Sequence, residues 1–254
     1  MQELKDKVVI ITGASTPLGI GSAIARRFAQ RGGSLFLVAE ATEEQLSAVA
    51  KECRAQTGSG HIEQALIDLS VKGAAEEMVA QAYRLFGRVD VLINNAAVRS
   101  PFNFGDYTHA HFDQSIAVNI GAAFFASQAV IPIMRAQGGG RIIHMASQLG
   151  HVTYAQRALY GLTKAALIHL TKSMAYELGP ENIIVNAISP GPVETQVTLD
   201  RGQETTKKRI EQYLRIGRVG APTEIADLAL FLATDSPAFL QGQDIVIDGG
   251  YIIH

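Results

Sequence analysis

The chain has 254 residues, 47% of them hydrophobic, and its 22 Lys and Arg residues nearly balance 24 Asp and Glu residues, for a net charge of −2. This length and apolar content permit one large core of α/β type, and the lack of a basic run argues against a nucleic-acid partner. The single cysteine, Cys53, excludes an intrachain disulfide and a cysteine metal cluster. The N-terminus lacks the apolar stretch of a signal peptide, and we expect no membrane span, so a soluble cytoplasmic protein is predicted.

The first predicted element is a buried parallel strand at 8–11, where a β-branched apolar run is too short for a helix. It runs into Thr12-Gly13 and a turn that ends in Gly19-Ile20-Gly21, after which apolar residues recur at helical spacing. Glycines let the backbone approach a pyrophosphate, and a helix N-terminus offers free N–H groups. The pattern therefore indicates dinucleotide binding, with an ordinary glycine-rich turn as the alternative.

Strands and helices alternate along the rest of the chain. The sequence predicts strands at 8–11, 35–39, 62–67, 89–93, 141–145, 183–188 and 244–247, and helices near 21–31, 43–57, 72–86, 108–136, 154–178 and 223–233. This alternation predicts a doubly wound, Rossmann-type parallel sheet with helices on both faces, as one domain over 1–254. The polar region 194–218 has weak periodicity and is interpreted as a flexible flap on the substrate side.

A tyrosine and a lysine four residues apart stand in the predicted helix 154–178, in the sequence YGLTK. Tyr160 and Lys164 are separated by about one helical turn, so their side chains share one face. An ammonium one turn away lowers the pKa of a phenol toward the range useful for moving a proton. Ser147 could hold a substrate oxygen beside the phenol. A pair of surface residues without a catalytic role is the alternative, since such pairs are common on helices.

These pieces together resemble the short-chain dehydrogenase/reductase family over essentially the whole chain. The matching motifs are TG…GIG at 12–21, Asp68 after the third strand, NNAA at 94–97, Asn119, Ser147, YGLTK, PGPVET at 190–195 and DGG at 248–250. Tyr160 follows Ser147 by 13 positions, the spacing usual in that family. The resemblance implies seven parallel strands in the order 3-2-1-4-5-6-7 and hydride exchange between a nicotinamide cofactor and an alcohol or ketone substrate.

The family's pattern also implies roles for individual residues. Asn119, Ser147, Tyr160 and Lys164 form the expected catalytic set, in which Asn119 opens its helix locally and holds a water in a proton relay with Lys164. The substrate is expected to contact Ser147, Gln148 and Tyr160. The expected cofactor contacts are Gly13, Gly19, Ile20, Gly21, Glu40, Asp68, Leu69, Asn95, Ala96, Tyr160, Lys164, Val193 and Thr195.

Some of these residues also have plain structural interpretations. Asp68 could cap a helix that begins near Val71, whereas the resemblance implies a hydrogen bond to the adenine amino group. Asn94 and Asn95 could be turn residues, whereas the family uses the second asparagine to brace the central sheet. Thr195 could be a helix cap, whereas the resemblance puts its hydroxyl on the nicotinamide carboxamide.

The sequence departs from the family's pattern at two places. Five residues, 14–18, separate Gly13 from Gly19, two more than is usual, and Pro17 stiffens this turn. We expect the extra residues to bulge outward and pyrophosphate binding to survive. NNAA replaces the usual NNAG, a mild change wherever Ala97 has a negative φ.

Cofactor choice depends on the end of the second strand. Glu40 is placed to accept hydrogen bonds from a ribose diol and to repel a 2′-phosphate. No Lys or Arg follows the strand, and the turn 14–18 has no basic residue. The sequence therefore favours NAD over NADP, with a solvated Glu40 as the alternative interpretation.

The expected substrate pocket is polar. It is lined by Arg99, Gln148, His151, Tyr154, Arg157 and parts of 194–216, which favours a polyol, a sugar or another hydroxylated small molecule. The histidines form no set with metal-ligand spacing, and His144 is interpreted as a structural residue in or beside a strand. An NADP-dependent carbonyl reductase, for example of 3-oxoacyl type, and a catalytically silent dinucleotide-binding regulator remain alternatives.

Two predicted helices are apolar on more than one face, which indicates burial on more than one side. In 108–136 and 154–178, residues such as Phe124, Phe125 and Leu162 extend beyond the stripe that would cover the sheet. The family pairs these helices across two-fold axes. A homotetramer or homodimer is therefore predicted, with a monomer carrying scattered apolar surface residues as the alternative.

Overall fold

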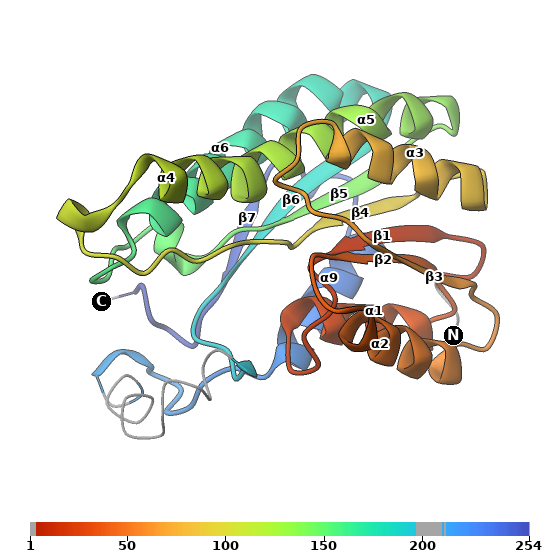
Figure 1. Ribbon diagram of the computed structural model, residues 1–254. Coiled ribbons are helices and arrows are strands. Elements are labelled where there is room, and N and C mark those ends of the chain that lie inside the picture. The colour runs from red at the N-terminus through yellow and green to blue at the C-terminus, as the bar shows by residue number, and fades with distance from the viewer. Residues whose placement is uncertain (1–3, 197–209, 211, 254) are drawn as a thin grey trace.

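A computed structural model describes residues 4–196, 210 and 212–253, and most of the predicted flap, at 197–209 and 211, lies outside them. One sheet contains β1 (Val8–Thr12), β2 (Ser34–Ala39), β3 (Ile62–Leu66), β4 (Val91–Asn94), β5 (Gly140–Met145), β6 (Ile183–Pro190) and β7 (Asp244–Ile247). The strand order is 3-2-1-4-5-6-7 and every pair is parallel, as Figure 1 shows. The predicted fold class and strand order are confirmed.

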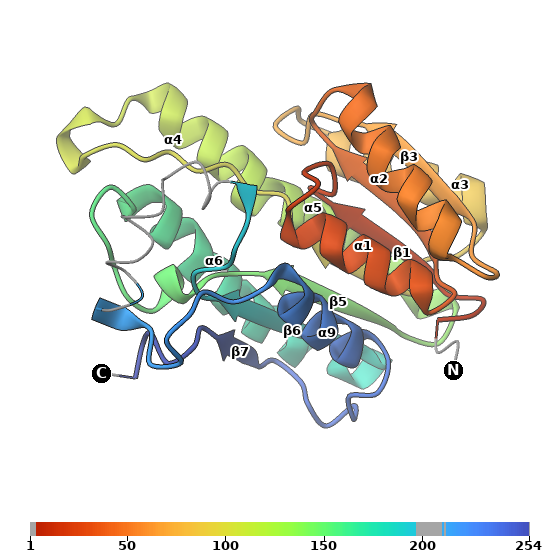
Figure 2. The same cartoon turned by 90° about the horizontal axis from the view of Figure 1, so that it is seen from below.

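Helices cover both faces of the sheet (Figures 1 and 2). The helices are α1 (Ile20–Gln30), α2 (Glu43–Gln56), α3 (Ala74–Phe86), α4 (His109–Ile116), α5 (Ala122–Ala136), α6 (Ala158–Leu178) and α9 (Pro222–Ala233). One face is packed by α1, α2 and α9, and the other by α3, α5 and α6, each through its own apolar cluster. The inner strands β1 and β4 are buried along their whole length, as expected for parallel strands covered on both sides.

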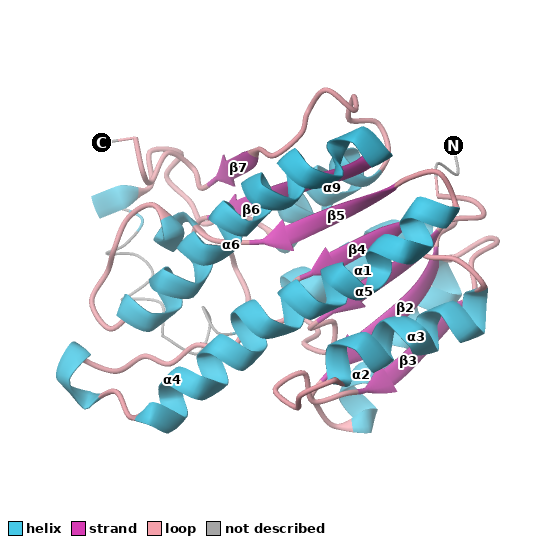
Figure 3. Ribbon diagram, turned by 90° about the horizontal axis from the view of Figure 1, so that it is seen from above, coloured by secondary structure: helices cyan, strands magenta, loops and turns pink. Residues whose placement is uncertain are grey.

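Because the strands are parallel, all of their carboxyl ends meet at one edge of the sheet. Figure 3 shows this edge on the left, where the arrowheads of β5 and β7 point. In a doubly wound sheet, ligands bind beyond this edge, where the strand order reverses. Here the order reverses between β1 and β4, and the loops after both strands carry predicted site residues.

Two predicted helices begin later than their periodicity indicates. The helix expected at 154–178 starts at Ala158, because Gln156 adopts a left-handed backbone with φ of 61° that a right-handed helix cannot include. The helix expected at 72–86 starts at Ala74, after Gly73 with φ of 86°. The strand expected at 89–93 begins two residues later and ends one residue later, at Val91–Asn94.

The predicted helix 108–136 is interrupted. Between α4 and α5 the backbone forms a π-helical turn at Ala117–Gly121, and Asn119 is buried within it. The expected local opening at Asn119 is thus confirmed. Contrary to the expectation of no such segment, His109–Ala136 is long and apolar enough to span a membrane. Its apolar character has another cause, because Ala122, Ala126 and Val130 pack in the core against the sheet.

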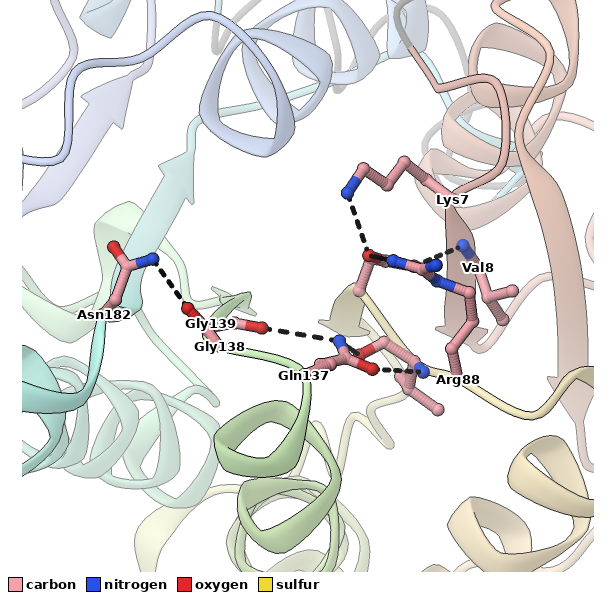
Figure 4. Close-up of polar contacts among 9 residues, drawn as sticks. Lys7, Val8, Arg88, Gln137, Gly138, Gly139 and Asn182 are labelled. Carbon is pink, nitrogen blue, oxygen red and sulfur yellow. Dashed lines mark hydrogen bonds and ion pairs between the residues drawn. The ribbon is translucent and has the colours of Figure 1, made fainter.

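The amino edge of the sheet is closed by a charged cluster around Asp90. Its carboxylate accepts hydrogen bonds from Lys7 Nζ at 3.1 Å, from Val8 N at 2.9 Å and from Arg88 Nε at 2.8 Å. Figure 4 shows the Lys7 and Arg88 side chains converging there. Nearby, Gln137 Nε2 donates to Val89 O at 2.6 Å and joins the end of α5 to the start of β4. These contacts tie the first strand to the centre of the sheet at the end opposite the candidate site.

Candidate active site

A cavity of about 870 Å³ opens at the carboxyl edge of the sheet. Loops that follow β1, β2, β4, β5 and β6 all contribute to its wall. Of the predicted cofactor and catalytic residues, it is lined by Gly13, Gly19, Ile20, Gly21, Glu40, Leu69, Asn95, Ala96, Ser147, Gln148, Tyr160, Lys164, Val193 and Thr195. Residues spread over most of the chain therefore share one cavity.

The glycine turn after β1 is shaped for close backbone approach. Gly13 has a φ of 71°, and a Cβ there would lie 2.9 Å from Ala96 Cα. A Cβ on Gly21 would lie 2.3 Å from Gly13 O, so α1 can pack against the turn only with glycine at this position. The N-cap of α1 is Gly19, which has no side chain to cap the first turn. Gly19, Ile20 and Gly21 line the cavity, and a helix N-terminus with free N–H groups at such a place suits the pyrophosphate of a dinucleotide.

The two extra residues of this turn do point outward, as expected. Thr16, Pro17 and Leu18 are exposed, while Ala14 and Ser15 before them are buried. Ser22 Oγ donates to Thr16 O at 2.6 Å, and Arg26 donates to Pro17 O at 3.0 Å, so the longer turn is held by α1. The cradle formed by the glycines is thus left open.

Asn95 braces the centre of the sheet. Its Nδ2 donates to Thr12 O at 2.8 Å and to Gly13 O at 3.1 Å. Thr12 Oγ1 in turn accepts from the backbone N–H groups of Asn95 and Ala96, each at 3.0 Å. Asn94 instead points into the core, where its Nδ2 lies 3.1 Å from Ser127 Oγ. Both asparagines therefore do more than form a turn, and Ala97 has no positive φ.

His144 lies inside β5 and is fully buried, which agrees with its structural interpretation. Its Nδ1 lies 3.2 Å from Asn94 Nδ2. Burial, and then the charge of Lys164, lower the pKa of His144 to about 4. It is therefore a neutral imidazole at physiological pH, and its ring does not add a charge beneath the site.

The nucleotide end of the cavity carries Glu40, which directly follows β2 and is exposed. Ile67 and Leu69, after β3, line the same part of the wall. Asp68 between them does not line the cavity among the described residues, and it does not cap a helix at Val71 either. Its Oδ1 accepts from Ser70 N at 2.8 Å and Ser70 Oγ at 2.6 Å, and these bonds lower the pKa of the carboxyl.

Tyr160 and Lys164 stand in the first two turns of α6 and are both buried. Lys164 Nζ donates to Met145 O, the last residue of β5, at 2.6 Å and lies 5.5 Å from the centre of the Tyr160 ring. Ser147, two residues beyond β5, lines the same cavity as Tyr160 and Lys164, and its side chain lowers the pKa of Tyr160. The three residues that the sequence pairs thus lie at one cavity.

Electrostatics at this site favour proton transfer. Burial raises the pKa of Tyr160, but the charge of Lys164, the charge and hydrogen bond of Arg99, and the hydrogen bond of Ser147 outweigh it, so the pKa is lowered. Burial lowers the pKa of Lys164 itself, against the influence of Tyr160. A phenol with a lowered pKa beside an open cavity is suited to accepting and releasing a proton.

Asn119 does not line the cavity but lies behind it. Its Oδ1 accepts from Val98 N at 2.8 Å, and its Nδ2 donates to Val98 O at 3.0 Å and to Thr163 Oγ1 at 3.1 Å. Thr163 Oγ1 donates to Tyr160 O at 2.8 Å. The π-helical turn thus joins the loop after β4 to the helix that carries Tyr160.

Only some of the predicted substrate-pocket residues line the cavity. Arg99, Gln148 and Arg157 do, but among the described residues His151 and Tyr154 do not. His151 Nε2 is instead 2.5 Å from Asp244 Oδ2 on β7, a contact that ties the loop after β5 to the edge strand. The cavity formed by the described residues thus does not include these two side chains.

Sequence reasoning missed three functional supports. Thr12 organises the Asn95 brace, Met145 offers the carbonyl that anchors Lys164, and Thr163 connects Asn119 to α6. Thr12 stands in the TG pair that opens the glycine turn, which was a usable signal. No sequence signal marks the Met145 carbonyl, because every residue carries a backbone oxygen whatever its side chain.

Comparison with known proteins agrees with this geometry. Residues 13–252 match a family model described as enoyl-(acyl carrier protein) reductase. The chain is 34% identical to the 3-oxoacyl-(acyl-carrier-protein) reductase of Thermotoga maritima, over 98% of this chain and 99% of that protein. It is 31% identical to the NAD-dependent glycerol dehydrogenase of Listeria innocua, over 98% of this chain and 95% of that protein.

A solved structure agrees as well. The short-chain dehydrogenase/reductase from Serratia marcescens BCRC 10948 superposes with a TM-score of 0.89 at 35% identity, over 98% of this chain and 99% of the other. The match covers the sheet, the glycine turn and the Ser147, Tyr160 and Lys164 region together. The chain therefore belongs to the short-chain dehydrogenase/reductase family, whose members are oxidoreductases.

Proposed function

We propose that this chain is an NAD-dependent oxidoreductase that interconverts a secondary alcohol and a ketone. One observation carries the proposal: the Tyr160 side chain meets Ser147 and Lys164 in the same cavity that is lined by Gly13, Gly19 and Glu40. A nucleotide lying along the glycine turn would bring its nicotinamide toward the phenol. NAD, when bound, supplies the hydride acceptor for alcohol oxidation.

The residues of this chain would manage the proton. In oxidation, the substrate hydroxyl gives its proton to the phenolate oxygen of Tyr160, while Ser147 holds the same substrate oxygen by a hydrogen bond. Lys164 stabilises the phenolate and is itself anchored by the carbonyl of Met145. Asn119, in its π-helical turn, supports proton exit through water. In ketone reduction the same proton moves in the opposite direction.

We propose NAD as the cofactor instead of NADP because of the charges at the nucleotide end of the cavity. Glu40 follows β2 at the nucleotide end of the cavity, where a carboxylate accepts hydrogen bonds from a ribose diol and repels a 2′-phosphate. The turn 14–18 has no basic residue to attract that phosphate. The similarity to an NAD-dependent glycerol dehydrogenase is consistent with this choice.

A second candidate is an NADP-dependent carbonyl reductase of 3-oxoacyl type, favoured by the similarity to the Thermotoga maritima reductase. A silent dinucleotide-binding regulator is disfavoured, because such a protein would have no reason to keep Tyr160 and Lys164 buried together against Ser147. Thr195 and Val193, which are buried at the cavity, are proposed to contact the nicotinamide end. Asp68 does not line the cavity itself but stands between Ile67 and Leu69, which do, and it is proposed to contact the adenine.

The wider biological setting is also a proposal. The cytoplasmic location stays a prediction from the sequence. A homotetramer or homodimer is supported by apolar side chains that α5 and α6 expose. Phe124 and Phe125 are each 46% exposed and Leu162 is 51% exposed, on helices whose other faces pack in the core. Polar side chains in the cavity wall, such as Gln148 and Arg157, support a polyol, a sugar or another hydroxylated small molecule as substrate.

The proposal is tested by incubating the purified chain with NAD or NADP and a panel of secondary alcohols, and with NADH or NADPH and the matching ketones. Formation or loss of the reduced nicotinamide is followed by its absorbance. We expect turnover with at least one alcohol–ketone pair and a higher kcat/KM with NAD. Cofactor binding without turnover of any pair would favour the regulator, and a higher kcat/KM with NADPH would favour the carbonyl reductase.

A further inference from the structure

Besides Lys164, a second positive side chain lies at the end of the cavity that holds Tyr160, which is called the reacting end below. Arg99, in the loop after β4, lines the cavity and is exposed to it. Its guanidinium carbon lies 5.8 Å from the centre of the Tyr160 ring, close enough for its charge to lower the pKa of the phenol. Lys164 Nζ lies 5.5 Å from the same ring centre. Two positive side chains therefore flank one phenol.

This arrangement is electrostatically unfavourable in the free protein. Burial lowers the pKa of Lys164, and the charge of Arg99 lowers it further. Elsewhere in the described residues, six arginines pair with carboxylates: Arg26, Arg27, Arg84, Arg88, Arg135 and Arg218. Arg99 has no carboxylate partner among the described residues. A guanidinium held beside a second cation without an acid is suited to a ligand that brings the acid.

Positive side chains also outnumber negative ones in the cavity wall as a whole. Among the described residues that line it, Glu40 is the sole acid, and it stands after β2 at the nucleotide end. The reacting end carries Arg99, Lys164 and Arg157. A low-dielectric wall with one sign of charge concentrates ligands of the opposite sign.

We propose that Arg99 binds a carboxylate of the substrate, so that the enzyme's substrates are hydroxy acids and the corresponding oxo acids. Arg99 and Tyr160 line the same cavity, with the guanidinium carbon 5.8 Å from the centre of the phenol ring, so a carboxylate bound by Arg99 would lie a few bonds from an oxygen held by the Tyr160 hydroxyl. That proximity fits a carboxylate attached one or two carbons from the carbinol carbon. A polyhydroxy acid would satisfy this anchor and the polar wall together.

The inference rests on the proposed alcohol–ketone chemistry and adds the charge of the substrate. The carboxylate itself is unchanged in the reaction. The carbinol carbon loses a hydride to oxidised NAD and its hydroxyl loses a proton to the Tyr160 phenolate, which leaves the oxo acid, NADH and a neutral tyrosine. Arg99 is thus a specificity residue that contacts the part of the substrate that does not react.

The test compares acids with neutral partners of similar shape: 3-hydroxybutanoate with its methyl ester, lactate with lactamide, and gluconate with glucitol. In the wild type, we expect kcat/KM for at least one acid to exceed that of its partner by about tenfold or more. Arg99→Gln should lower the ratio of kcat/KM for that acid to kcat/KM for its neutral partner about 10- to 100-fold, because any effect on the pKa of Tyr160 changes both substrates alike and cancels in the ratio. Arg99→Lys should retain part of the preference for the acid over its neutral partner. Arg84→Gln, which alters an arginine on α3, should leave kcat/KM for both substrates unchanged.

A binding measurement separates this inference from the proposed function. The enzyme saturated with NADH is titrated with each hydroxy acid, a combination that cannot turn over, and quenching of nicotinamide fluorescence gives Kd. We expect Kd for the preferred acid to rise about tenfold or more in Arg99→Gln. Binding that depends on Arg99 without any turnover would support the anion site and contradict the alcohol–ketone chemistry.

Three results would overturn the assignment of Arg99. Wild-type enzyme could oxidise the neutral alcohols and reject the acids, in which case the proposed function stands alone. Arg99→Gln could slow acids and neutral partners equally while moving the pH profile, which would show that Arg99 acts only on Tyr160. An absence of both turnover and acid binding would remove the inference and the proposed function together.

Discussion

The ammonium of Lys164 lies 5.5 Å from the centre of the Tyr160 ring, one helical turn along α6. It is held there by a 2.6 Å hydrogen bond to Met145 O at the end of β5. The helix therefore sets the spacing of the two side chains, and the sheet fixes the direction in which the lysine points. This relationship makes the phenol the expected proton carrier of the site.

Replacing Tyr160 with phenylalanine should abolish turnover and leave NAD binding nearly intact. The change removes the oxygen that transfers the proton and preserves the packing of the buried ring, so kcat should fall about 10²- to 10⁴-fold. Steady-state kinetics and NADH titration measure the two effects. Turnover within about tenfold of the wild type, which corresponds to about 1.4 kcal/mol of barrier, would exclude the proposed role.

Replacing Lys164 with methionine should move the pH profile of alcohol oxidation to higher pH. The charge of Lys164 lowers the pKa of Tyr160, so its loss raises that pKa. The phenolate, which is the form that accepts the proton, then forms only at higher pH, and the rising limb of kcat moves with it. Cofactor affinity should fall as well. If the rising limb of kcat does not move in the variant, a group other than Tyr160 controls the pH dependence.

Replacing Glu40 with serine should narrow the preference for NAD over NADP. The substitution removes an acceptor for the ribose diol and the charge that repels a 2′-phosphate. The ratio of kcat/KM values for the two cofactors measures the effect, with Glu43→Ser in the first turn of α2 as the control. A wild type that prefers NADP, or an unchanged ratio in the variant, would show that Glu40 does not contact the cofactor.

Replacing Asp90 with asparagine should destabilise the fold by about 2 kcal/mol, because three donors lose their charged acceptor. Although burial raises the pKa of Asp90, hydrogen bonds from Arg88, Val8 and Lys7 outweigh it, so the net pKa is lowered. The stabilisation is therefore complete above the pKa of the unfolded chain and is lost as pH falls below it. Thermal unfolding from neutral to acidic pH measures this loss.

The control for that experiment is Glu181→Gln, which removes an ion pair with Arg135 on the surface. Exposed pairs contribute little, so Tm should stay close to that of the wild type. An Asp90→Asn variant that is as stable as Glu181→Gln at neutral pH would contradict the structural role assigned to the cluster at the amino edge.

Light scattering after size exclusion should give a mass of two or four times 27.2 kDa. The Phe124 and Phe125 rings on α5 contact each other edge to face, with centres 5.4 Å apart, yet each stays 46% exposed, and a neighbouring subunit would cover them. Phe125→Asp should lower this mass, whereas Tyr83→Asp on α3, where the tyrosine is 48% exposed, should leave it unchanged. A monomer at micromolar wild-type concentration would contradict the proposal.

The sequence by itself determined the features that depend on neighbours along the chain. The strand, glycine turn and helix at 8–31, the order of the elements and the shared face of Tyr160 and Lys164 all follow from apolar periodicity and helical spacing. The opening of the helix at Asn119 was expected from the family's pattern and is present as a π-helical turn.

Only the tertiary structure decided which distant residues meet. Asn95 reaches Thr12 across 83 residues because β1 and β4 are neighbours in the sheet, and Arg99 reaches Tyr160 because loops after β4 and β5 share one edge. His151 pairs with Asp244, 93 residues away, instead of entering the pocket. The left-handed Gln156 delays α6 and redirects this segment. Such contacts depend on strand order and loop path, which local periodicity does not encode.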